Sequence, residues 1–131
     1  MNRPKILVAE DDSDMRLSLD VCLRVRGFDV LAVDDGDDAL ESLNLGTPRE
    51  YSLLITDIVM GRMTGIELID KVMKKFPELP VLVITGYNTR ETAEALKKRK
   101  RNTVLYKPFS EDTLLCEIKR ILPSFMLRGE V

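Results

Sequence analysis

The chain contains no histidine and no tryptophan, and it has only two cysteines among its 131 residues. Without histidine, nucleophilic catalysis by a Ser–His or Cys–His pair is excluded, because the usual general base is missing. Cys22 and Cys116 stand alone, each inside an apolar helical pattern and without the spacing of a metal site. We therefore interpret them as reduced core cysteines of a cytosolic protein.

The sequence also lacks an excess of charge of one sign and any long apolar run. Its 20 basic and 22 acidic residues leave a net charge of −2, which favours neither nucleic acid nor a membrane surface as a partner. The apolar run at residues 6–9 is too short for the core of a signal peptide. No run approaches the roughly 18 residues that a membrane span requires. We expect a cytoplasmic protein with no membrane partner and no direct nucleic-acid partner.

What the chain does contain is a regular alternation of short apolar runs with amphipathic segments. The runs predict strands at residues 6–9, 30–33, 53–57, 81–84 and 104–106. The segments between them predict helices that begin near Ser13, after an acidic turn at 34–38, at the capping box Thr64–Glu67, at Asn88 or Thr89, and at Ser110. Their predicted ends are at Gly27, Gly46, Phe76, about Lys100 and Pro123.

Five successive strand–helix units predict an α/β fold with a parallel sheet covered on both faces. Their number and length fit a flavodoxin-like, doubly wound, five-stranded sheet of order 2-1-3-4-5 with five helices. This domain is expected to occupy residues 1–123. Residues 124–131 then form a short C-terminal tail or the start of a linker.

Polar side chains stand at the carboxyl ends of four of the predicted strands. Glu10 and Asp11 follow the first strand, Asp57 ends the third, Thr85 ends the fourth and Lys107 follows the fifth. In a parallel sheet these ends meet at one edge, which is where ligands bind. Other acids, Asp12 and those at 34–38, are interpreted as helix caps and turn residues.

The chemistry of this edge follows from its charges. Three neighbouring carboxylates repel one another unless a cation joins them or one is protonated, and hard oxygen ligands suit Mg²⁺. Lys107 offers a compact positive charge for a phosphoryl oxygen, and the Thr85 hydroxyl offers a hydrogen bond. A carboxylate nucleophile in such surroundings is suited to accept a phosphoryl group, and we predict that Asp57 does so.

Four segments carry a resemblance to a known family: residues 6–12, 56–65, 83–86 and 106–109. Together, and in this order, they resemble the receiver domain of response regulators in two-component signalling, over about residues 5–122. The resemblance implies that Asp57 takes a phosphoryl group from the phosphohistidine of a sensor histidine kinase, from a phosphotransfer protein in a phosphorelay, or from a small donor such as acetyl phosphate.

The same resemblance implies a role for each site residue. Asp11, Asp57 and the backbone carbonyl of Val59 would ligate Mg²⁺, and Glu10 would act through a water molecule. Thr85 and Lys107 would hold the phosphoryl oxygens. The peptide bond between Lys107 and Pro108 is expected to be cis.

The chain departs from the family's pattern at several positions. Val104 stands where receivers usually carry the aromatic side chain that responds to the threonine, and Gly61 stands where proline is typical. In receivers, the places that Val59 and Tyr87 occupy shape the access of water to the phosphorylated aspartate, and an apolar and a bulky side chain there predict slow self-dephosphorylation. The basic run 97–101 is interpreted first as a solvated helix end and second as a docking patch for an acidic partner.

The resemblance also implies partners and leaves alternatives. A kinase or phosphotransfer protein would phosphorylate the domain, and an output partner or a second copy would bind the face made by the fourth helix, fifth strand and fifth helix. The chain would be no enzyme beyond its own phosphorylation and dephosphorylation. A pseudo-receiver that binds partners without phosphorylation is the main alternative. A dehalogenase-type phosphatase would need an acid at Val59, and a nucleotide or flavin binder would need backbone donors where Glu10 and Asp11 stand.

Overall fold

The computed structural model describes residues 3–47, 49–61, 63–86, 89–99 and 102–124. Strands and helices alternate along them as β1 (Lys5–Ala9), α1 (Ser13–Val25), β2 (Asp29–Val33), α2 (Gly36–Leu45), β3 (Leu53–Asp57), α3 (Gly65–Lys75), β4 (Val81–Thr85), α4 (Arg90–Lys97), β5 (Asn102–Tyr106) and α5 (Glu111–Ile121). The predicted tail, residues 124–131, lies outside the described residues apart from Ser124.

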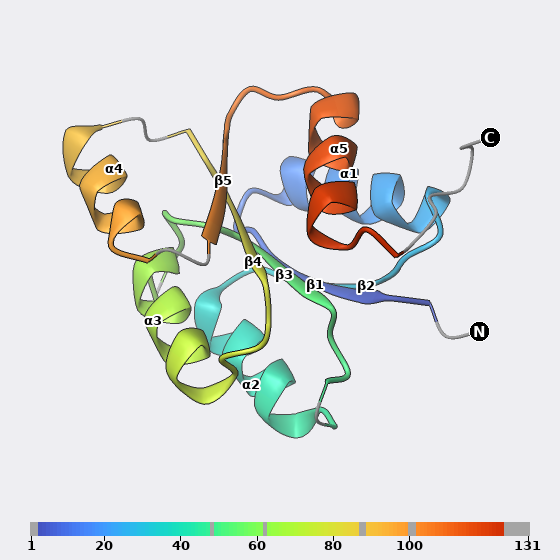
Figure 1. The fold of residues 1–131 in the computed structure, drawn as a ribbon, viewed down its shortest axis with the longest axis horizontal. Helices are drawn as coiled ribbons and strands as arrows, with labels where there is room; N and C mark the ends of the chain where they lie inside the picture. The colour runs from blue at the N-terminus through green and yellow to red at the C-terminus, as the bar shows by residue number, and fades with distance from the viewer. Residues whose placement is uncertain (1–2, 48, 62, 87–88, 100–101, 125–131) are drawn as a thin grey trace.

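The five strands form one parallel sheet in the order β2-β1-β3-β4-β5 (Figure 1). Helices α1 and α5 cover one face, and α2, α3 and α4 lie on the other. Successive residues of a strand point to opposite faces, so Ile6 and Val8 pack under α1 and α5 while Leu7 and Ala9 pack under α2 and α3. The predicted fold class and strand order are confirmed.

Most helix starts follow the predicted capping residues. The hydroxyls of Thr64, Thr89 and Ser110 each accept a hydrogen bond from the backbone N–H three residues later. Helix α1 begins at Ser13 as predicted, but its cap is Asp12, whose side chain accepts from the N–H of Asp14; the interpretation of Ser13 itself as a possible N-cap was wrong by one residue.

Two further boundaries differ from the prediction. Residues 36–38 were expected in an acidic turn but form the first turn of α2, because the Asp35 carboxylate accepts the Asp38 N–H at 2.8 Å and starts the helix there. Helix α4 ends at Lys97 rather than near Lys100. Just beyond its end, the Arg99 carbonyl accepts the N–H of Asn102, the first residue of β5, at 3.1 Å instead of continuing a helical pattern.

The two cysteines differ in their surroundings. Both are free thiols, Cys22 packs half-buried against the core, and Cys116 is exposed, so its assignment to the core was wrong. Burial, together with the neighbouring Glu111 carboxylate, raises the pKa of Cys22 to about 11.

The helices of the part of the chain that the structure describes were compared with the length and hydropathy that a membrane span requires, and none of them meets both requirements.

Helix α4 is anchored by few groups. Leu96 is its one buried residue, and Arg99, just beyond its end, donates two hydrogen bonds to the Asp70 carboxylate of α3 at 2.7 and 2.8 Å. Arg99 also bonds the carbonyl of Ala95 in α4 itself. Arg99, one cation of the basic run 97–101, therefore joins two helices and is not free to bind a partner. Lys97 and Lys98 of the same run are exposed.

We expect this ion pair to hold α4 against α3. In a double-mutant cycle of Arg99→Gln and Asp70→Asn, the coupling energy should be about 0.5–1 kcal/mol, the range of well-aligned pairs that are partly exposed. Amide hydrogen exchange should quicken in α4 and stay unchanged in α1. Additive effects of the two substitutions would show that the pair contributes nothing to the anchoring.

Candidate functional site

Two of the site residues stand one position beyond a strand and are held there by the sheet itself. The N–H of Glu10, after β1, donates to the Val33 carbonyl of β2 at 3.0 Å. The N–H of Lys107, after β5, donates to the Thr85 carbonyl of β4 at 2.8 Å. Each bond extends a ladder of parallel strands by one step, so both backbones are fixed where their side chains leave the sheet.

The alternation of strand side chains then brings three charged groups to one face. Glu10 continues the series of Ile6 and Val8, Asp57 that of Leu53 and Ile55, and Lys107 that of Leu105. All of these apolar side chains pack in the cluster beneath α1 and α5. Glu10, Asp57 and Lys107 therefore emerge on the same side of the sheet at its carboxyl edge.

Lys107 joins the two carboxylates directly. Its Nζ donates to Asp57 Oδ2 at 2.7 Å and to Glu10 Oε1 at 2.8 Å. Glu10 is completely buried and Asp57 is 6% exposed. The peptide bond that follows Lys107 is cis, as predicted. The structure thus confirms that these three residues share one rim.

Burial and pairing act against each other on the protonation of this group. Burial raises the pKa of Glu10, and the hydrogen bond from Lys107 offsets only part of that rise. Burial alone would lower the pKa of Lys107, but its hydrogen bonds to Asp57 and Glu10 outweigh this effect and the pKa is raised. Lys107 is therefore a firmly charged ammonium between two acids.

The backbone orients the Asp57 carboxylate. Oδ1 accepts hydrogen bonds from the N–H groups of Ile58 at 2.6 Å and Val59 at 3.2 Å, which leaves Oδ2 to Lys107. The loop that supplies these donors is fastened to the core by Ile58, Met60 and Met63, all buried. Val59 is 44% exposed, at the rim of the site.

Two predicted site residues lie differently. Asp11 is exposed, on the loop between β1 and α1. Thr85 is completely buried, and by strand alternation it follows Val81 and Val83 toward the opposite face from Asp57. Thr85 does stand at the predicted edge, one position beyond Ile84, the register partner of Asp57.

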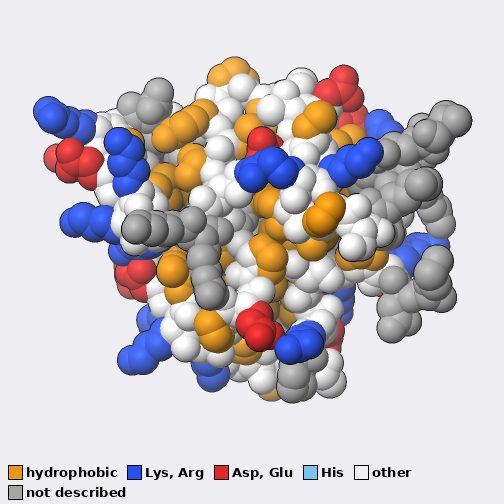
Figure 2. All heavy atoms as spheres, in the orientation of Figure 1, with side chains coloured by type: hydrophobic (Ala, Val, Ile, Leu, Met, Phe, Trp, Pro, Cys, Tyr) orange, Lys and Arg blue, Asp and Glu red, His pale blue; other side chains and the backbone are white. Residues whose placement is uncertain are grey.

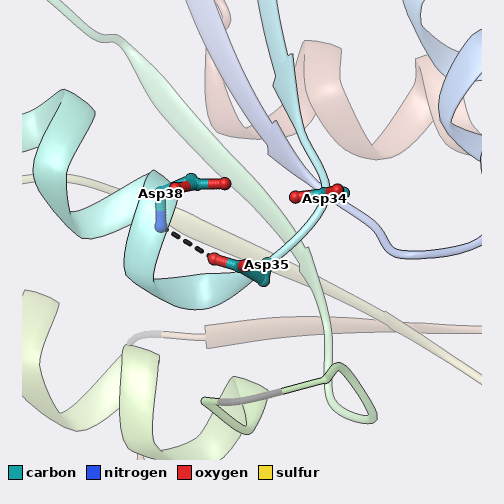
Figure 3. A group of neighbouring side chains, drawn as sticks. All are labelled: Asp34, Asp35 and Asp38. Atoms are coloured by element: carbon teal, nitrogen blue, oxygen red, sulfur yellow. Dashed lines mark hydrogen bonds between the residues drawn. The ribbon is translucent and has the colours of Figure 1, made fainter.

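Among the described residues, the only three acids whose oxygens all lie within 4.8 Å of one another are Asp34, Asp35 and Asp38 (Figure 3). Glu10, Asp11 and Asp57 do not form so compact a set. In Figure 3 the Asp35 carboxylate points at the backbone N–H of Asp38, the bond that caps α2. Asp35 is therefore a helix cap, one of the two roles that the sequence interpretation allowed for these acids, and negative charge close to a helix N-terminus is favourable.

The donor set of the site fits a magnesium ion chemically. Glu10, Asp11 and Asp57 carry three negative charges, and Lys107 returns one positive charge, so the edge retains an excess of negative charge. All the available donor atoms are oxygens, which hard divalent cations prefer over nitrogen or sulfur.

One residue at this edge was missed by the sequence analysis. Arg16 of α1 donates from Nη1 to the Glu10 carbonyl at 2.9 Å and to the Asp11 carbonyl at 3.4 Å. A signal for it was available in the sequence: a basic residue one turn into the helix that follows an acidic run can reach back to that run.

Two predictions about switching and lifetime concern neighbouring positions. Val104 lies in β5 opposite Val83 of β4 and packs, partly buried, against the core beneath α2 and α3. Position 104 itself therefore carries a β-branched aliphatic side chain and not an aromatic ring. Tyr87 lies outside the described residues, so its predicted role stays a prediction.

Comparison with known proteins bears on the whole chain. The profile of the response regulator receiver domain family matches residues 6–119. The response regulator receiver protein CpdR of Brucella abortus is 38% identical over 118 residues, which cover 90% of this chain and 96% of CpdR. The nitrogen assimilation regulatory protein NtrX of Azorhizobium caulinodans is 33% identical over 128 residues, which cover 96% of this chain but only 28% of that protein.

Solved structures agree with this placement. The chemotaxis response regulator CheY4 of Vibrio cholerae superposes with a TM-score of 0.82 at 26% identity and covers 92% of this chain and 99% of its own. NtrX of Brucella abortus, solved with ADP, gives a TM-score of 0.82 at 32% identity, and the match covers 94% of this chain and 28% of that one. The matched family profile, the near full-length similarity to CpdR and the shared strand order lead to one conclusion: the chain belongs to the response regulator receiver domains of two-component systems.

Proposed function

We propose that this receiver domain is switched by reversible phosphorylation of Asp57. The observation that carries the proposal is the bridge from Lys107 Nζ to Asp57 Oδ2 and Glu10 Oε1. A buried carboxylate whose other oxygen is held by two backbone N–H groups presents one oxygen, Oδ2, to an incoming group. The ammonium beside Oδ2 can turn to a phosphoryl oxygen and neutralise it.

In the proposed reaction, Asp57 Oδ2 attacks the phosphorus of a phosphohistidine on a sensor kinase or phosphotransfer protein. An O–P bond forms as the P–N bond breaks, and the imidazole nitrogen leaves with the electron pair and takes up a proton. Asp11, Asp57 and the Val59 carbonyl would hold Mg²⁺, with Glu10 acting through water. The ion supplies charge neutralisation for the transferred oxygens. Lys107 would hold one of those oxygens, and Thr85 would hold a second once its hydroxyl turns from the opposite face of the sheet toward Asp57.

Phosphorylation can be tested with acetyl phosphate and MgCl₂ on phosphate-affinity gels, with intact-mass measurement as a second readout. The wild-type chain should gain one phosphoryl group, and Asp57→Asn should gain none. Asp34→Asn removes an exposed acid outside the Lys107 bridge and should behave like the wild type. If neither acetyl phosphate nor a histidine kinase modifies the wild-type chain, the pseudo-receiver interpretation replaces this proposal.

The partners follow from the same proposal. A sensor histidine kinase or phosphotransfer protein would be the phosphoryl donor, and an output partner or a second copy would bind the face made by α4, β5 and α5, where Tyr106 is 39% exposed. On the face shown in Figure 2, basic and acidic side chains are interspersed. Nucleic-acid binding would call for basic side chains clustered on one surface, and the mixture of charges on this face does not favour it. We also propose a cytoplasmic location and no catalytic activity on other substrates.

The lifetime of the phosphorylated state should depend on Val59. Its side chain is 44% exposed two positions after Asp57, where an apolar group keeps water from lining up with phosphorus. Val59→Asn would place a hydrogen-bonding amide there, and we expect several-fold faster phosphate release. Val59→Leu, which preserves the apolar character, should keep the wild-type rate. Equal release from the Asn and Leu variants would show that this position does not control access of water.

A further inference from the structure

Arg16 is a cation of α1 that is joined by hydrogen bonds to the backbone of the acidic loop between β1 and α1. Its Nη1 contacts the carbonyl oxygens of Glu10 at 2.9 Å and Asp11 at 3.4 Å. These are the two acids that separate β1 from the cap of α1, Asp12. A single nitrogen therefore restrains two consecutive peptide units.

The restrained peptide units determine where the two carboxylates point. The Glu10 side chain has no freedom of its own, because Oε1 accepts from Lys107 and Oε2 accepts the Asp12 N–H at 3.2 Å. The peptide unit between Glu10 and Asp11 sets the direction in which the Asp11 side chain leaves the loop. Asp11 is exposed, so packing does not fix its direction.

The place of Arg16 in α1 is electrostatically unusual. It lies in the first turn and a half of the helix, near the positive end of the macrodipole, where a cation is disfavoured. Helical side chains lean toward the N-terminus, and this lean carries the guanidinium back to the loop carbonyls. Its hydrogen bonds to these two carbonyl oxygens offset the unfavourable interaction with the helix dipole.

We propose that Arg16 is a positioning residue for the divalent-cation site, and that it acts by fixing the peptide units of Glu10 and Asp11. This inference rests on the proposed function, since it assumes that Asp11 and Asp57 bind Mg²⁺. Arg16 itself contacts neither the ion nor the phosphoryl group. Groups that orient metal ligands in this way typically contribute 10–100-fold to metal affinity.

A charge effect alone predicts the opposite sign. Arg16 brings a positive charge close to a cation site, so its removal without any loss of geometry would strengthen Mg²⁺ binding by reducing repulsion. If positioning dominates, removal weakens binding. The sign of the change in affinity therefore separates the two effects.

The test compares Arg16→Met, Arg16→Lys and Arg24→Met with the wild-type chain. Arg24 lies on the same helix and also donates to a backbone carbonyl, that of Val30 at 2.6 Å, but it belongs to the β2 side of α1. Mg²⁺ affinity is measured by titration calorimetry without a phosphodonor, and the free energy of unfolding is measured in urea. We expect Arg16→Met to weaken Mg²⁺ binding by about 10-fold. Arg16→Lys should restore part of the affinity, and Arg24→Met should lose stability without losing affinity.

Unchanged or tighter Mg²⁺ binding by Arg16→Met would overturn the positioning role while leaving the cation site intact. Equal losses of affinity in Arg16→Met and Arg24→Met would also overturn it, because both would then follow from general destabilisation. A wild-type chain that binds no Mg²⁺ would overturn the proposed site and this inference with it.

Discussion

Replacement of Lys107 by methionine is expected to destabilise the folded chain by roughly 3 kcal/mol near pH 7 in the presence of EDTA. The substitution keeps most of the side-chain volume but removes the one charge that Glu10 and Asp57 share. Glu10 is completely buried, and loss of one partner from a buried ion pair typically costs more than the pair contributed. The chelator ensures that no divalent cation compensates for the missing ammonium.

Protonation of Glu10 limits this cost. A carboxyl group with the ordinary pKa of 4.5 is neutralised at pH 7 for about 3.4 kcal/mol, so the folded variant cannot lose much more than this amount through Glu10. In the wild-type chain, burial already raises the pKa of Glu10, and without Lys107 the pKa rises further. The folded state then binds a proton more readily than the unfolded state, so stability falls as the pH rises above 4.5.

The free energy of unfolding of Lys107→Met should therefore recover on acidification. Between about pH 7 and pH 5 the deficit relative to the wild type should shrink by up to about 1.4 kcal/mol per pH unit. Adding Glu10→Gln should restore most of the stability at neutral pH, because the amide needs no counterion. Urea denaturation of the single and double variants at both pH values measures each quantity. A deficit that is independent of pH and remains in the double variant would mean that the bridge is not the source of the loss.

The Lys107 bridge also shows what could be predicted from the sequence. An apolar run followed by Glu10, another ending at Asp57 and a third followed by Lys107 sufficed, because parallel strands end at one edge and alternate sides with a period of two. Counting that period back from each residue reaches Val8, Ile55 and Leu105, all of which pack on one face. The same counting sends Thr85 to the other face, an inference that the sequence already permitted.

Other features depend on tertiary contacts that no local pattern contains. Just beyond the end of α4, the Arg99 carbonyl accepts the Asn102 N–H of β5, and the Arg99 guanidinium donates to Asp70, which is 29 residues away in the sequence. Helix propensity favoured continuation through the lysines and arginines, and the tertiary contact overrode it. Arg16 was missed for a different reason: its contacts are local, but its partners are backbone carbonyls, and only its position shortly after the acidic run pointed to them.

Gly65→Ala should be the other severely destabilising substitution, with a loss of roughly 3 kcal/mol in the free energy of unfolding. A Cβ at this position would lie 2.1 Å from the Asp57 carbonyl oxygen and 2.6 Å from the Ile58 Cα. Both are backbone atoms, so no side-chain rotation can relieve the overlap. The start of α3 is drawn this close by the hydrogen bond from the Gly65 N–H to the Ile58 carbonyl at 2.7 Å.

Gly61→Ala is the matched control, because it makes the same change four residues earlier, in the loop before α3, where the new Cβ would meet nothing within 4 Å. It should change stability by no more than about 0.5 kcal/mol. Urea unfolding followed by circular dichroism compares the two variants, and phosphorylation by acetyl phosphate compares their function. If Gly65→Ala proved as stable as Gly61→Ala, the start of α3 would not be packed closely against the backbone of Asp57 and Ile58.

In Gly65→Ala, the loss of stability should be accompanied by slower phosphorylation, whereas Gly61→Ala should show no such link between stability and phosphorylation. Relief of the overlap requires the peptide units of Asp57 and Ile58 to move, and the Ile58 N–H is the closest donor to Asp57 Oδ1. Any movement that accommodates the methyl group therefore also turns the carboxylate away from Lys107. The folded fraction of Gly65→Ala should therefore accept a phosphoryl group more slowly than the wild type. The reason is that close packing at Gly65 determines both where α3 begins and how the Asp57 carboxylate is oriented.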